Sequence, residues 1–103
     1  MSKYLVNKLI HLVNGNPEAL EGYLADPPGF VARWEAGQSL QLSDEERRAL
    51  AEGDYEWLYA MGAHPFILWS FTQAIYERER DRTELIDDYK RKTAAIGYPD
   101  FRT

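Results

Sequence analysis

The segment from Gly62 to Phe71, which reads GAHPFILWSF, constrains the fold of this chain more than any other. We expect Gly62 to end one helix, His64 to cap the next and Pro65 to open it, because proline lacks an N–H group that would have no partner in a first turn. Large apolar side chains then cover more than one helical stripe: Phe66, Ile67, Leu68, Trp69 and Phe71. A helix that is apolar all round must be covered on several sides. The segment therefore predicts a central helix, or one that offers part of its surface to a partner.

The composition limits the classes of protein to which the sequence can belong. A length of 103 residues fits one domain, spanning residues 1–103, and the formal net charge is −5. This charge argues against nucleic-acid binding, which needs a basic face, and the lack of cysteine excludes disulfides and thiolate metal sites. No signal-peptide pattern opens the sequence, and no stretch approaches the roughly 20 apolar residues that span a bilayer. We expect a cytoplasmic protein that binds neither nucleic acid nor membranes.

Signals for helix starts and ends recur along the chain. Gly15 suits a left-handed position after a first amphipathic helix, and Asn16 is placed to cap a second. Ser43 and Glu46 have the spacing of a capping box, and Asp54 is placed to cap a further helix. We therefore expect an all-α fold, a compact bundle of about six or seven helices with short loops. Its expected core contains Leu9, Leu24, Trp34, Leu50, Leu58, Leu68 and Phe71.

The region after Pro65 is long for one helix, because neither glycine nor proline occurs again before Gly97. An unbroken helix would be longer than a domain of this size is wide. We expect a bend or break near Arg82–Thr83, with Thr83 as the new cap, a helix from there to Ile96 and a loose end at 97–103.

Residues that could carry chemistry are sparse. The histidines are His11 and His64, and their separation does not match a common metal-binding motif. Asp87 and Asp88 are adjacent, so on a helix they point about 100° apart and do not form a working pair of carboxylates. We expect no catalytic residue and no metal site in this chain.

Three pieces of the sequence resemble the small, all-helical alpha subunit of protocatechuate 4,5-dioxygenase, an extradiol ring-cleaving enzyme. Tyr4–Leu9 resembles its opening helix, Tyr23–Trp34 the helix pair that follows, and Leu42–Gly62 its strongest block. The resemblance covers about residues 3–76. His64-Pro65 departs from that subunit but looks like other short relatives, and the charged segment from about residue 77 has no clear counterpart.

The resemblance implies a division of labour between two chains. In such enzymes the large subunit holds non-haem Fe(II) with two His and a Glu, and the small subunit covers the mouth of the active site. This chain is then a non-catalytic subunit, inactive alone and binding no cofactor, whose partner is a large catalytic subunit that carries the Fe(II). His64 would face the substrate or the partner's active site, and the aromatic residues of the interface would be Trp57, Tyr59, Phe66, Trp69 and Tyr76.

Each of these assignments has a plainer alternative. His64 could serve only as a helix cap, and Trp57 and Trp69 could belong to the core. The whole fold could instead be a recognition domain, as in precursor peptides of ribosomally made natural products that present a C-terminal tail to a modifying enzyme. A presented tail should be flexible and rich in modifiable residues, whereas Thr83–Ile96 is expected to be helical.

Overall fold

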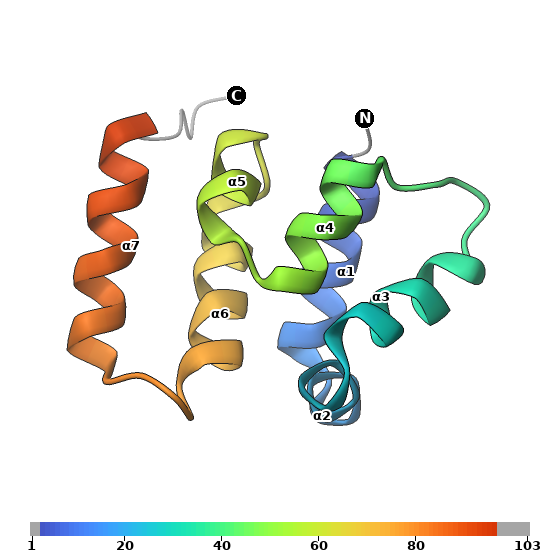
Figure 1. Cartoon of the computed structure of the whole chain (residues 1–103), viewed down its shortest axis with the longest axis horizontal. Helices are drawn as coiled ribbons and strands as arrows, with labels where there is room; N and C mark the ends of the chain where they lie inside the picture. The colour runs from blue at the N-terminus through green and yellow to red at the C-terminus, as the bar shows by residue number, and fades with distance from the viewer. Residues whose placement is uncertain (1–2, 97–103) are drawn as a thin grey trace.

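The computed structural model describes residues 3–96, and within that range it contains seven α-helices and no strand (Figure 1). The expected all-α bundle is confirmed. The expected loose end at 97–103 lies outside the described residues. The helices are α1 (Lys3–Gly15), α2 (Pro17–Ala25), α3 (Pro27–Ala36), α4 (Asp44–Glu52), α5 (Tyr55–Ala60), α6 (Pro65–Tyr76) and α7 (Arg82–Ile96). None of these helices is long and apolar enough to cross a membrane.

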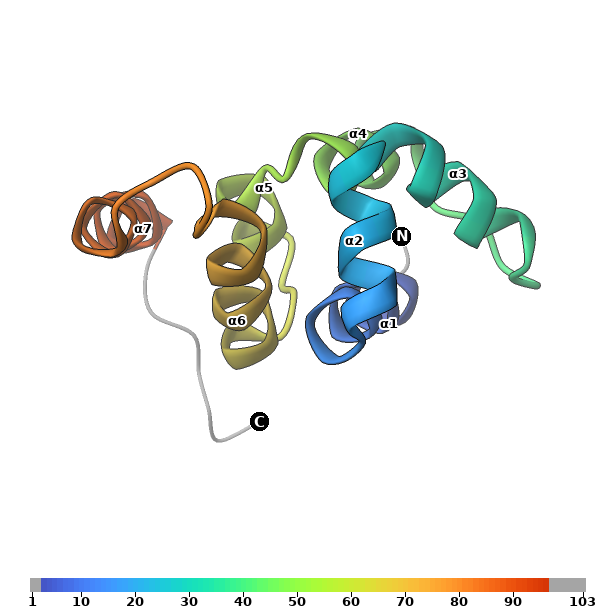
Figure 2. The same cartoon turned by 90° about the horizontal axis from the view of Figure 1, so that it is seen from below.

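Helix α6 is central in the bundle, which accounts for its unusual apolarity. It packs against α1 on one side and against α5 and α7 on the other, as the two views in Figures 1 and 2 show. Leu68 and Phe71 are fully buried, and burial of such side chains is the main source of stability in a small domain. The other expected core residues that are fully buried are Leu9, Leu50 and Leu58, whereas Leu24 and Trp34 are half-buried and pack on the edge of the core.

Four of the expected caps are confirmed. The Asn16 side chain accepts hydrogen bonds from the first turn of α2, and Asp54 accepts one from α5. Ser43 Oγ accepts from the Glu46 N–H at 3.1 Å while Glu46 Oε1 accepts from the Ser43 N–H at 2.8 Å, which completes the capping box. The His64 ring caps α6.

Two local expectations are wrong. Gly15 is the last residue of α1 and does not have positive φ; the extended backbone of Asn16, with φ of −130°, already turns the chain into α2. Thr83 lies inside α7, because Asp81 Oδ2 accepts from the N–H groups of Thr83 and Glu84 at 3.2 and 3.4 Å. The break between α6 and α7 therefore lies slightly earlier than expected.

Gly53 gives a test of the turn between α4 and α5. Its φ of 64° is left-handed, and a Cβ atom there would lie 2.8 Å from Tyr76 Oη. Gly53→Ala should lower the free energy of unfolding by about 1–2 kcal/mol, because an L-residue is strained in this conformation. The measurement is urea unfolding followed by circular dichroism.

Gly15→Ala is the matched control for that experiment. Nothing lies within 4 Å of a Cβ atom at Gly15, and alanine favours helices over glycine, so the change should be neutral or stabilising by up to about 0.5 kcal/mol. Equal losses in the two variants would contradict the assigned strain at Gly53.

Candidate partner interface

The turn before α6 is held by contacts with the start of α1. The His64 N–H donates to Asn7 Oδ1 at 2.8 Å, and His64 Nδ1 accepts from the Ile67 N–H at 3.4 Å. In the neutral ring that makes this contact, the proton is on Nε2, because Nδ1 is the acceptor. Gly62 has φ of 100°, and the Lys3 side chain lies against it. His64 is exposed, its backbone is held by Asn7 and its ring by the first turn of α6, and within residues 3–96 no hydrogen bond involves its Nε2.

Phe66 lies beside that histidine at the start of α6. Its side chain is 66% exposed, and its ring centroid is 6.0 Å from that of His64. Aromatic residues are enriched in protein interfaces, whose rims are polar. We call His64 and Phe66 together the His64–Phe66 edge.

Tyr59 and Trp69 are brought together by α7. The Tyr89 ring of α7 lies 4.7 Å from the Trp69 ring and 6.3 Å from the Tyr59 ring, both in edge-on geometry. Both predicted interface residues are half-buried, so the chain itself covers part of their surface. Trp69 also lines a groove of about 390 Å³ with Ile86, Tyr89 and Lys90.

Tyr76 is the last residue of α6, at the opposite end of that helix from the His64–Phe66 edge. The Tyr76 hydroxyl donates to the Gly53 carbonyl at 2.9 Å and its ring meets Tyr55 edge-on at 5.8 Å, and burial raises the pKa of Tyr76. Trp57 is half-buried and packs against the core. The stacked rings of Tyr55 and Tyr89 join Tyr76 to Tyr59 and Trp69, so the structure brings three of the predicted interface residues into one aromatic cluster.

The sequence did not predict a charged cluster that lies between α5 and α7. The Tyr55 hydroxyl donates to Asp88, and this hydrogen bond lowers the pKa of the Asp88 carboxyl, with a further contribution from Lys92 Nζ at 3.2 Å. Arg80 adds a second cation at 3.7 Å, and Arg91 on the next turn of α7 adds a third. The buried or half-buried face of α7 contains Leu85, Asp88, Tyr89, Lys92 and Thr93, a spacing typical of one helical face. The spacing can be read from the sequence, but Asp88, Lys92 and Thr93 are polar or charged, so the pattern of apolar residues did not indicate this face.

Neither histidine belongs to a ligand cluster in the described part of the chain. Among residues 3–96 no group of three or more His, Asp or Glu side chains is arranged to hold a metal ion. His11 is exposed on α1, and His64 makes the cap contacts described above. The assignment of an iron site to a separate subunit stays a prediction.

Comparisons of this chain with protein-family models, with curated proteins and with solved structures found no match.

Proposed function

We propose that this chain is the non-catalytic small subunit of an Fe(II) extradiol ring-cleaving dioxygenase and covers the active site of a separate large subunit. The observation that carries the proposal is the His64–Phe66 edge, where a largely exposed aromatic ring lies beside a fixed, exposed imidazole. The resemblance of residues 3–76 to the alpha subunit of such enzymes supplies the identity of the partner. In this proposal the Fe(II) and its ligands belong to the large subunit, and this chain contributes only contacts.

The chemistry of the edge suits a lid over an active site. Phe66 can fill an apolar pocket on the large subunit, and aromatic anchors of this kind dominate the energy of many interfaces. His64 offers a hydrogen-bond donor whose position does not depend on the partner, because α1 and the first turn of α6 hold it. An imidazole in this position can orient a polar group of a substrate enclosed by the two subunits.

Helix α7 favours this proposal over the alternative of a precursor-peptide domain. Residues Arg82–Ile96 form a helix in which Asp88 contacts Tyr55 of α5 and Tyr89 contacts both Tyr55 of α5 and Trp69 of α6. A segment held in this way is not a tail presented to a modifying enzyme, at least as far as Ile96.

The interface is tested by co-expressing the chain with the large dioxygenase subunit encoded nearest to it in its genome. Phe66→Ala should weaken the complex about thirtyfold, the effect of losing an anchor worth about 2 kcal/mol. Leu40→Ala is the control, because Leu40 is also exposed, at 54%, but lies in the segment between α3 and α4. If the chain forms no complex with that subunit, or if both variants bind like the original, the proposal is wrong.

The role of His64 is tested with two substitutions in the same complex. His64→Asn should keep the helix cap, because asparagine caps well, yet lower turnover more than it weakens assembly. His64→Ala should lose both the cap and the imidazole. His11→Ala is the control and should change neither the turnover nor the affinity of the complex. Unchanged turnover in His64→Asn would restrict His64 to its structural role.

A further inference from the structure

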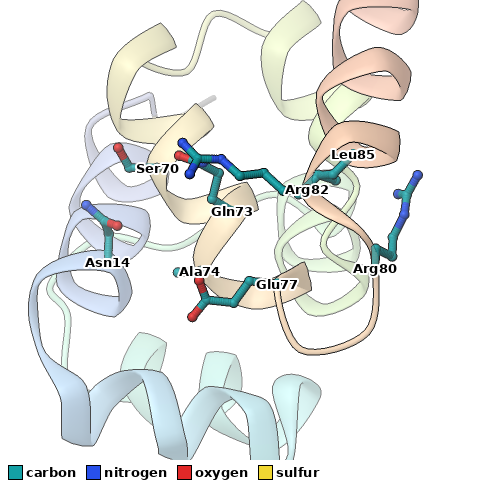
Figure 3. Close-up of a pocket in the computed structure, with 8 residues that line it drawn as sticks. All are labelled: Asn14, Ser70, Gln73, Ala74, Glu77, Arg80, Arg82 and Leu85. Atoms are coloured by element: carbon teal, nitrogen blue, oxygen red, sulfur yellow. The ribbon is translucent and has the colours of Figure 1, made fainter.

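A hollow of about 410 Å³ lies between the end of α1, the middle of α6 and the start of α7 (Figure 3). Its size falls in the range of small-molecule sites. It is lined by Asn14, Ser70, Gln73, Ala74, Glu77, Arg80, Arg82 and Leu85. None of the predicted interface residues lines it, so the hollow is separate from the His64–Phe66 edge.

The wall from α6 is polar, although the helix as a whole is apolar. Ser70, Gln73 and Glu77 recur at a spacing of three and four residues, which places them on one helical face. This face is turned toward the hollow between α1 and α7 (Figure 3). The fully buried Leu68 lies on the opposite side of the helix by its spacing. The hollow therefore presents hydroxyl and amide groups, with Ala74 and Leu85 as apolar lining.

The two arginines of the hollow differ in what they contact. Arg80 Nη1 donates to the Tyr55 hydroxyl at 3.3 Å and Arg80 is paired with Asp88, and Figure 3 shows its side chain turned away from the hollow. The Arg82 side chain extends across the hollow toward Gln73 and Ser70. Within residues 3–96 no carboxylate pairs with Arg82. Glu77 lies at the opposite end of the hollow from the Arg82 guanidinium in this view.

We propose that this hollow binds a small monocarboxylic acid. The Arg82 guanidinium would hold the carboxylate through two parallel hydrogen bonds, the geometry that arginine offers and lysine does not. Gln73 and Ser70 supply further donors beside it, and Ala74 and Leu85 contact the carbon body. Glu77 disfavours a second negative charge at the far end, so a dicarboxylate binds less well. The site needs no residue from a partner and goes beyond the proposed function.

The test is a titration of the isotope-labelled full chain, followed by two-dimensional NMR of backbone amides. Benzoate and acetate are the carboxylate probes, benzamide is the neutral counterpart of benzoate, and inorganic phosphate and succinate complete the set. We expect saturable shifts at Ser70, Gln73 and Arg82 with the two monocarboxylates and none with benzamide. Saturation by benzamide or by phosphate at the same concentrations would overturn the assignment, as would the absence of saturable shifts with benzoate and acetate.

Three variants locate the binding at Arg82. Arg82→Gln should weaken benzoate binding about tenfold or more, as expected for loss of a charge-assisted pair, whereas Arg78→Gln, at an exposed arginine paired with Glu21, should not. Gln73→Glu supplies an internal carboxylate for Arg82 and should abolish benzoate binding. Glu77→Gln should strengthen succinate binding relative to benzoate. Equal benzoate affinity in Arg82→Gln and Arg78→Gln would place the ligand elsewhere.

Discussion

Phe71→Ala should lower the free energy of unfolding by about 3–5 kcal/mol, the usual cost of truncating a fully buried phenylalanine. Phe71 is 0% exposed in the middle of α6, and its ring meets Tyr23 edge-on at 5.6 Å. The truncation would remove both the buried area and this aromatic contact, and it would leave a cavity at the centre of the bundle. Chemical denaturation followed by circular dichroism measures the loss.

Phe66→Ala is the matched control, since both residues are phenylalanines of the same helix. Phe66 is 66% exposed, and exposed substitutions usually change stability by no more than about 0.5 kcal/mol. The pair also separates two roles, because Phe66 is expected to matter for the complex and Phe71 for the fold. A loss in Phe66→Ala as large as that in Phe71→Ala would contradict the burial pattern described here.

Asp88→Asn should lower the free energy of unfolding by about 2–3 kcal/mol at neutral pH. The carboxylate accepts from the buried Tyr55 and is paired with Arg80, Arg91 and Lys92. Its neutral replacement leaves three neighbouring cations without a balancing charge. Asp87→Asn is the control, because Asp87 is the exposed neighbour on the same helix. Its effect should stay within about 0.5 kcal/mol.

The effect of Asp88→Asn on the free energy of unfolding should depend on pH. The hydrogen bond from Tyr55 lowers the pKa of Asp88 in the folded state, whereas the unfolded value is about 3.9. The charged form is therefore the one that the fold favours, and its contribution is complete above the unfolded pKa. It is lost as the pH falls through the folded pKa. The difference in unfolding free energy between the original chain and Asp88→Asn should be largest near neutral pH and shrink below about pH 4. A difference that does not change with pH would exclude the charge as its cause.

The helices of this chain are largely determined by local sequence. Ser43 and Glu46 satisfy each other's backbone N–H groups across three residues. At the start of α6 the His64 ring accepts from the Ile67 N–H, and Pro65 has no N–H to satisfy. These contacts depend only on residues within one helical turn, so a spacing pattern predicts them. The local errors, at Gly15 and Thr83, occurred where a neighbouring residue, Asn16 or Asp81, supplied the cap.

The candidate interface could be predicted only in part. The exposure of Phe66 and the cap at His64 follow from the start of α6, and both were expected from the segment itself. The partial burial of Trp69 and Tyr59 was not expected, because the Tyr89 ring of α7 causes it and no spacing rule links Tyr89 to these two residues. The resemblance to a dioxygenase subunit ends near residue 76, so it could not indicate that Tyr89 packs on these two residues.

What the sequence by itself determined is the set of helices, their caps and the apolar character of α6. The tertiary structure alone decided that α6 lies between α1 and α7, that Tyr55 meets Asp88 33 residues away, and that Arg82 lies across a hollow from Asn14. Helix formation is a matter of neighbouring backbone groups, whereas these pairings depend on how whole helices pack. For that reason the sequence predicted the elements, and only the packed structure could show which side chains they bring together.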